Sequence, residues 1–218
     1  MGRIQVAMVA GWLVGSSGLA AQQRSSVSVA VTPFFGLANP MRDLLLRPGL
    51  DALRDPESQA LYGTVGARVT VDVSKRFAVE ADIGLGKSGL KVSSLSAPSG
   101  TNVKVSTLSG RLVYRLRPTN EAAWFAAHAG VASVRRTFSE NSGVPSRISD
   151  GSNVGGVLGA TLGFRLADRA ALTITADDFL YNAGFDVLRS GGTKTRSLSL
   201  TQNDLRVTLG VRFVLVGR

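Results

Sequence analysis

Charged side chains recur at alternate positions in segments that are otherwise apolar. Glu80 and Asp82 are two residues apart, so both carboxylates lie on one face of an extended strand. Such a pair is a candidate acid–base dyad. Arginines follow the same rule in the segment 205–213, where odd positions are apolar and even positions are polar, charged or glycine. Ten charged residues lie on polar faces of this kind: Arg68, Asp72, Glu80, Asp82, Arg111, Arg115, Arg165, Asp177, Arg206 and Arg212.

The mixture of signs among these ten residues favours a structural role over catalysis. Carboxylates that face arginines form ion pairs, and we expect Arg111 and Arg115 to pair with Glu80 and Asp82 on the neighbouring strand. Six arginines against four acids predict surplus positive charge and a weak anion preference in any leak. We therefore interpret the ten residues as a structural charge network and assign no catalytic residue.

Other chemistry is limited by residue types that the sequence lacks. It has no cysteine, and His128 is its one histidine, which excludes thiolate and multi-histidine metal sites. We expect neither a metal nor another cofactor. His128 is the one imidazole base available to a lipid-modifying enzyme. The next serine, Ser133, is five residues further on, and odd spacing puts the two side chains on opposite faces of a strand.

The elements that carry these residues are strands with one apolar and one polar face. Eight such segments are predicted, at 27–36, 61–73, 77–85, 107–116, 124–134, 154–166, 172–177 and 205–213. The breaks between them alternate strictly between long and short. Short breaks lie at 74–76, 118–123 and 167–169, and long ones at 37–60, 91–102, 136–151 and 182–200. This combination predicts an all-β fold, an eight-stranded antiparallel transmembrane up-and-down β-barrel with long extracellular loops and short periplasmic turns.

The free-energy cost of placing a charged side chain in lipid decides which face is turned outward. One arginine on the lipid face at mid-membrane costs roughly 2–4 kcal/mol. The interior of an eight-stranded barrel is just wide enough for side chains to fill. The alternating pattern therefore predicts that the apolar face is turned to lipid and the charged face to a side-chain-filled lumen. A soluble barrel with the apolar face inward is the alternative.

Large aromatic residues cluster beside the breaks, and we expect them to form two belts at the membrane interfaces. Beside the short turns and near the C-terminus lie Phe77, Tyr114, Trp124, Phe125, Phe164 and Phe213. Beside the long loops lie Phe35, Tyr62, Phe138, Phe179, Tyr181 and Phe185.

The first residues are predicted to direct export. Arg3 precedes a short apolar stretch, and small residues follow it, which is typical of a signal peptide over residues 1–20 with cleavage near Ala20 to Gln22. The stretch is too short to span a bilayer as a helix. The barrel domain then comprises residues 25–218, and we expect it in the bacterial outer membrane.

At this point the chain resembles the OmpA-like family of eight-stranded outer-membrane barrels. The resemblance rests on three segments, Gly155 to Arg165, Asp178 to Tyr181 and Asn203 to Phe213. These are patterns of fold and not of activity. The resemblance implies the barrel fold and the outer-membrane location, and it names no ligand.

The expected function is a structural or surface-interaction role, without enzymatic activity. Two alternatives remain open: a narrow pore or conduit for small or hydrophobic molecules, and a lipid-modifying enzyme. The net charge of +10 is scattered and forms no basic helix or aromatic-interleaved cluster, so no nucleic-acid partner is expected. Membrane lipid is the expected partner, with anionic lipopolysaccharide at basic loops as one candidate. The sequence does not identify an extracellular partner.

Overall fold

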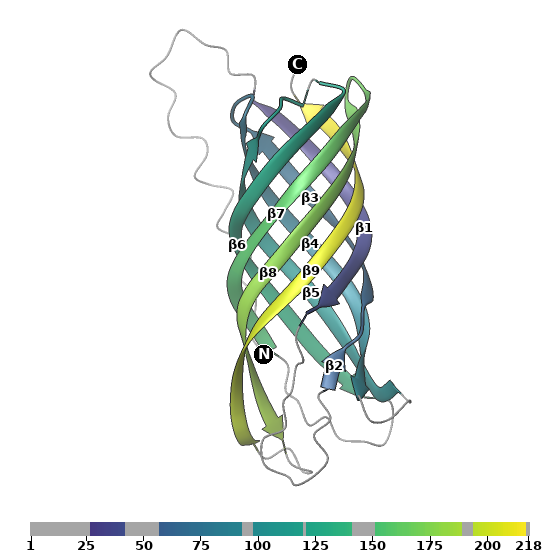
Figure 1. The fold of residues 1–218 in the computed structure, drawn as a ribbon, viewed down its shortest axis with the longest axis vertical. Helices are drawn as coiled ribbons and strands as arrows, with labels where there is room; N and C mark the ends of the chain where they lie inside the picture. Colours follow the sequence, from purple (N-terminus) through teal and green to yellow (C-terminus); the bar gives the residue numbers. More distant parts are fainter. Residues whose placement is uncertain are drawn as a thin grey trace.

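The computed structural model describes residues 27–41, 57–92, 98–119, 121–140, 151–188 and 194–216. These residues form nine strands and every paired strand is antiparallel (Figure 1). The strands are β1 (Ser28–Pro40), β2 (Glu57–Gln59), β3 (Tyr62–Asp72), β4 (Phe77–Val92), β5 (Pro98–Arg115), β6 (Ala123–Glu140), β7 (Gly151–Ala167), β8 (Ala170–Leu188) and β9 (Lys194–Val216).

Eight of these strands close into one barrel. Each long strand pairs with the next along the chain, β1 pairs with β9, and the β1–β3 pairing continues the sheet past the short strand β2. Strand β2 is an addition that pairs only with the loop-side end of β4, from Glu57 opposite Val92 to Gln59 opposite Leu90. The predicted eight-stranded antiparallel barrel is therefore confirmed.

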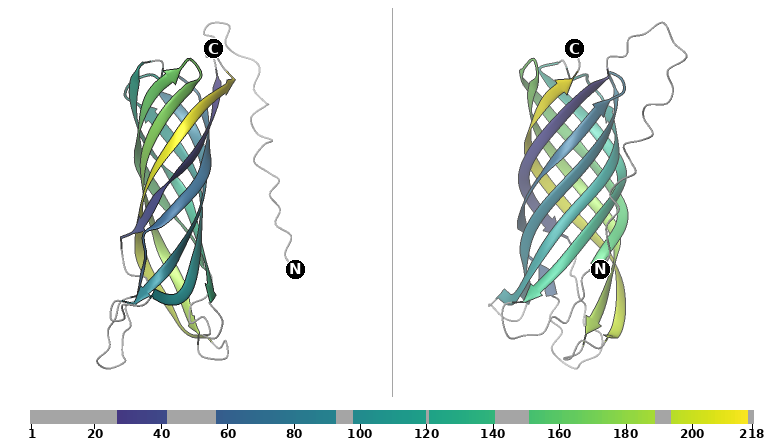
Figure 2. Two further views of the ribbon diagram at one scale, coloured as in Figure 1. Left: turned by 90° about the vertical axis from the view of Figure 1, so that its right-hand side faces the viewer. Right: turned by 180° about the vertical axis from the view of Figure 1, so that it is seen from behind.

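The short and long connections lie at opposite ends of the barrel (Figure 2). The connections β3–β4, β5–β6 and β7–β8 are short and lie at the end where the chain terminates, which is called the turn end below. The strand ends that the other connections join lie at the opposite end, which is called the loop end. The predicted signal peptide lies outside the described residues.

Several strands extend further toward the loop end than the sequence predicted. The segment 182–200 was expected to be a loop, but β8 continues to Leu188, β9 begins at Lys194, and the two stay paired throughout. Likewise β6 continues to Glu140 and β5 begins at Pro98. The alternation of apolar residues ends earlier than the strands because backbone pairing satisfies the amide and carbonyl groups whether or not one face contacts lipid.

The outer surface of the barrel is apolar over most of its height. Outward side chains such as Leu112, Val131 and Leu158 are 70%, 67% and 53% exposed. A soluble protein rarely exposes so continuous an apolar surface, and a bilayer covers it. Within the described residues, no helix has both the length and the apolar character needed to cross a membrane.

One of the two predicted aromatic belts is present and the other is wrong. At the turn end, five of the six predicted residues face outward: Phe77, Tyr114, Phe125, Phe164 and Phe213. The sixth, Trp124, is buried in the lumen. Of the loop-end residues whose side chains are described, Phe35 faces outward, while Tyr62, Phe138, Phe179 and Tyr181 are buried inside. The side chain of Phe185 lies outside the described residues. Position beside a loop therefore did not determine the direction of these rings.

Candidate functional site

The centre of the lumen holds a compact cluster of charged side chains from six strands. The central cluster comprises Arg68 of β3, Glu80 and Asp82 of β4, Arg111 of β5, His128 of β6, Asp177 of β8 and Arg206 of β9. Three arginines thus meet three carboxylates. All except the partly buried Glu80 are buried to more than nine-tenths.

Each of the three arginines bridges both aspartates of the central cluster. Arg206 Nη2 lies 2.9 Å from Asp82 and 2.8 Å from Asp177. Arg111 reaches Asp177 at 2.7 Å and Asp82 at 3.4 Å. Arg68 reaches Asp82 at 2.9 Å and Asp177 at 3.4 Å. Because every charge has partners of the opposite sign, the cluster joins strands on opposite sides of the barrel and closes the lumen.

Neighbouring residues shape the space around this cluster. The ring of Phe34 on β1 lies 4.4 Å from the guanidinium carbon of Arg68 and 5.1 Å from that of Arg206, within the range of a cation–π contact. On β7, Gly159 faces His128 and Asp177, and a Cβ there would overlap the His128 ring. The absence of a side chain at Gly159 therefore leaves room for the contact between His128 and Asp177.

A second, smaller group of charges lies toward the turn end. Asp72 pairs with Arg115 and, at 2.8 Å, with Arg212, and it accepts a hydrogen bond from Ser28 at 3.0 Å. The expected pairing of Arg115 with Glu80 and Asp82 is therefore wrong. Arg115 lies four residues further along the inward face of β5 than Arg111 and is therefore nearer the turn end.

Arg165 is the one predicted network residue that stands apart from the others. It occupies an inward position of β7 by alternation, but it lies only two residues before the end of that strand. Its side chain is 38% exposed and pairs with the exposed Asp168 in the adjoining turn at 2.6 Å. The prediction of an interior role for Arg165 is wrong because the lumen ends at this level.

A third charged group, not predicted from the sequence, lies near the loop end. Arg136 of β6 is fully buried and pairs with Asp204 of β9 at 2.6 Å. Arg136 also donates hydrogen bonds to Tyr181 and, at 2.9 Å, to Gln59 of β2. Tyr181 donates to Asp204 at 2.8 Å. The predicted loop began at Arg136, so its inward direction could not be read. Asp204 lay one residue before the segment whose alternation was used.

Around this third group the lumen is apolar. Val103, Val134, Val157 and Phe179 are at most 1% exposed and face inward. The outward neighbours at the same height are polar, including Lys104, Arg135 and Ser152. The polarity of the wall therefore inverts toward the loop end: charged inside and apolar outside at the centre, then apolar inside and polar outside. The inversion marks the edge of the band that contacts hydrocarbon, because beyond it the outer face meets headgroups and water.

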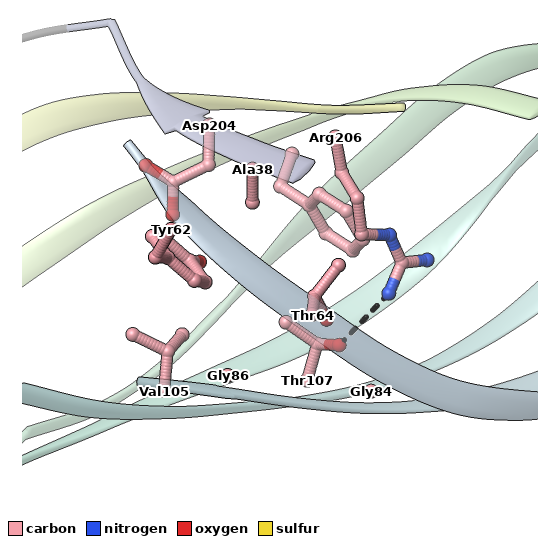
Figure 3. Close-up of a pocket in the computed structure, with 10 residues that line it drawn as sticks. Ala38, Tyr62, Thr64, Gly84, Gly86, Val105, Thr107, Asp204 and Arg206 are labelled. Carbon is pink, nitrogen blue, oxygen red and sulfur yellow. Dashed lines mark hydrogen bonds between the residues drawn. The ribbon is translucent and has the colours of Figure 1, made fainter. Parts of the chain in front are cut away.

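Two small cavities lie inside the lumen in the part of the chain that the structure describes. One lies between the central cluster and the apolar layer, lined by Tyr62, Thr64 and Arg206 among others, and measures about 10 Å³ (Figure 3). Its Arg206 donates to Thr107 at 3.2 Å. The other lies on the turn side of the cluster and measures about 20 Å³. A single water needs a cavity of roughly 10–15 Å³, so each cavity has room for about one water molecule.

The site contains few groups that could perform chemistry on a substrate. His128 Nε2 lies 2.8 Å from Asp177 and 3.3 Å from Arg111, and its ring is buried. Ser133 lies on the outer face of the same strand, as the odd spacing predicted. Glu80 accepts a hydrogen bond from Thr70 and pairs with Arg111 at 3.6 Å. Within the described ranges, no group of three His, Cys, Asp or Glu side chains is arranged to hold a metal ion.

Comparisons with known proteins identify the fold. No family model matches the sequence, and no curated protein matches it either. Solved structures do match. The outer membrane protein OprG from Pseudomonas aeruginosa superposes with a TM-score of 0.67 at 15% identity, covering 88% of this chain and 98% of that one. The outer membrane protein AlkL, solved in lipid bilayers, gives 0.58 at 18% identity, covering 92% and 95%. Neisserial surface protein A gives 0.51 at 10% identity, covering 85% and 96%.

The chain therefore has the fold of the small eight-stranded outer-membrane barrels, and the resemblance seen in the sequence is confirmed at that level. The apolar outer band and the shared fold together identify it as a transmembrane barrel of the bacterial outer membrane.

Proposed function

We propose that this protein is a closed barrel that acts through its loop end, as a structural and surface-interaction protein of the outer membrane. The observation that carries the proposal is the central cluster. Three arginines and three carboxylates from opposite walls meet across the lumen, and the cavities on either side have room for about one water each. A lumen filled in this way supports anchoring better than conduction.

The loop end is the part of the molecule best placed to meet other molecules. Strands β8 and β9 continue beyond the apolar band as a paired hairpin that projects at this end (Figure 1). Arg136 and Gln59 attach β2, and with it the end of the first long connection, to the barrel mouth. A rigid rim that carries long loops is a common scaffold for recognition. Anionic lipopolysaccharide remains a proposed partner of the basic loops.

A conduit for small hydrophobic molecules is the second candidate, and one observation favours it. The loop-end lumen is lined by apolar side chains, among them Val105, Phe138 and Phe179. An apolar molecule could be solvated there if these side chains moved apart. The central cluster opposes onward passage to the turn end, because an apolar solute would have to separate buried ion pairs, and leaving a buried charge uncompensated typically costs ~3–5 kcal/mol.

We propose further that the protein is not an enzyme. The strongest catalytic candidate, His128, is engaged by Asp177 and Arg111 in a filled part of the lumen. A general base must reach a substrate proton directly or through one water. The two small cavities that flank the central cluster have no room for a lipid substrate.

The test is permeability of vesicles that contain the refolded protein. A closed barrel leaves vesicles impermeable to a small sugar such as arabinose, and a hydrophobic fluorophore shows no saturable binding. Arabinose entry would refute the closed lumen. Saturable fluorophore binding that disappears in Phe179→Trp, which overfills the apolar layer, would favour the conduit. Release of fatty acid from vesicle lipid would indicate an enzyme.

A matched test addresses the loop end. Trypsin added to intact cells is expected to cut at Arg147 and Arg189, in the connections β6–β7 and β8–β9, and to leave Lys75 and Arg76 in the β3–β4 turn intact. Cleavage at Lys75 or Arg76 alone would place the turn end outside and overturn the proposed surface role of the loops.

A further inference from the structure

Three cations project outward from three adjacent strands of the wall. They are Lys87 on β4, Lys104 on β5 and Arg135 on β6, and all three side chains are exposed on the outer face. This set is called the wall cations below. None of the three belongs to the lumen network or to a loop.

The register of the sheet brings the wall cations together. Lys87 is directly opposite Lys104 in the β4–β5 pairing, and Ser106, two residues from Lys104, is opposite Arg135 in the β5–β6 pairing. Side chains directly opposite one another have Cβ atoms about 4.5–5.5 Å apart, and diagonal neighbours about 7–8 Å. Flexible side chains at these separations can reach a common ligand.

Like charges placed directly opposite on a sheet are destabilising unless something compensates them. The described part of the chain offers the wall cations no ion pair, and the residue opposite Arg135 on β7 is Ser152. Other strands carry neutral residues where their apolar outer face ends, such as Asn39 on β1, Asn182 on β8 and Asn203 on β9. Positive charge is therefore concentrated on one side of the barrel.

The height of the wall cations coincides with the edge of the membrane. On β4 the outward run of apolar side chains ends with Leu85, and Lys87 is the next outward residue. On β5 and β6 the last large apolar outward residues are Leu108 and Val131. One outward serine separates each of them from the cation on its strand. All three cations thus lie just beyond hydrocarbon, at the level of lipid headgroups.

We propose that the wall cations bind the phosphate groups of a lipid in the outer leaflet. Phosphate supplies several acceptor oxygens and up to two negative charges, which suits three converging donors. The occupant is a lipid and not a soluble anion because the apolar wall that begins at Leu85, Leu108 and Val131 continues directly below the cations and accommodates acyl chains. The site is independent of whether the lumen conducts.

Binding of lipid A to the refolded full-length protein in nanodiscs or detergent tests this site. The probes are lipid A with both phosphates and the same lipid after removal of its phosphates. The variant is K87Q/K104Q/R135Q. The control variant is K75Q/R76Q/R169Q, which removes three exposed cations from the turn end. At about 1 kcal/mol per cation near a charged surface, the first variant is expected to weaken binding of the phosphorylated lipid about a hundredfold.

The control variant is expected to bind within twofold of the natural sequence, and the phosphate-free lipid is expected to bind weakly to all three proteins. Equal losses in the two triple variants, or undiminished binding of the phosphate-free lipid, would overturn the proposal. If the triple variant fails to give a folded, heat-modifiable band, Lys104→Gln alone decides the matter. Lys104 is the centre of the set, and a loss of about fivefold is expected.

Discussion

The two halves of the lumen are built in opposite ways. The central and turn-end part is filled by ion pairs, and its outer wall is apolar. The loop-end part is filled by apolar side chains around the ion pair of Arg136 with Asp204, and its outer wall is polar. One strand can contribute to both: β5 turns Arg111 inward at the centre and Val103 inward at the loop end. The barrel thus has the pattern of a membrane protein at its centre and turn end, and the pattern of a soluble barrel at its loop end.

The strongest test of this contrast is removal of the most connected charge. Asp177→Ala deprives three buried arginines and His128 of a shared carboxylate. Breaking a buried pair typically costs ~3–5 kcal/mol because the remaining charge is uncompensated. We expect a loss of this size in urea unfolding of the protein in lipid vesicles. The control is Asp168→Ala in the exposed β7–β8 turn. Equal losses in the two variants would mean that water reaches the central cluster.

An apolar deletion at the loop end is expected to cost less. Val134 is 1% exposed among other apolar side chains, so Val134→Ala removes buried methyl groups and leaves a small cavity. The expected loss is about 2 kcal/mol in the same unfolding experiment. Ser133→Ala, its neighbour on the outer face, is expected to change stability by less than about 0.5 kcal/mol. If the serine variant is the less stable of the two, the inversion of the wall is wrong.

A smaller effect on global unfolding is expected where β2 attaches to the mouth. Gln59 is buried and accepts one hydrogen bond from Arg136. Gln59→Ala removes that bond to a charged donor, and the expected loss is about 1.5–3 kcal/mol locally, with less in global unfolding. Amide hydrogen exchange should accelerate in β2 and at the facing residues of β4, and should stay unchanged at the central cluster. Faster exchange around Asp177 would indicate that the two halves unfold together.

The smallest effect is expected at Arg165. Its side chain is partly exposed and pairs with the exposed Asp168. Exposed ion pairs contribute little, so Arg165→Ala is expected to alter stability by less than about 0.5 kcal/mol. A loss similar to that of Asp177→Ala would return Arg165 to the interior network.

The contrast between the two halves also explains what the sequence could predict. Where arginines alternate with valines and leucines along a membrane-spanning strand, the arginines must face the lumen. The barrel, the strand pairing and most of the central cluster were therefore predictable. His128 was noticed, but its partner Asp177 is 49 residues away, and no spacing rule in the sequence links the two. The apolar layer was not predicted because alternation was taken to keep one meaning along each strand. Phe179 and Tyr181 were therefore assigned to an outer belt, although they face inward.

Single-channel recording in a planar bilayer under a salt gradient tests the central claim, closure of the lumen by the charge clusters, most directly. The described lumen balances charge at the centre and has two arginines against one aspartate at the turn end. The expected result is therefore no steady conductance, with brief leaks that weakly favour anions. A large, stable, cation-selective pore would contradict both the filled lumen and the direction of its charged face.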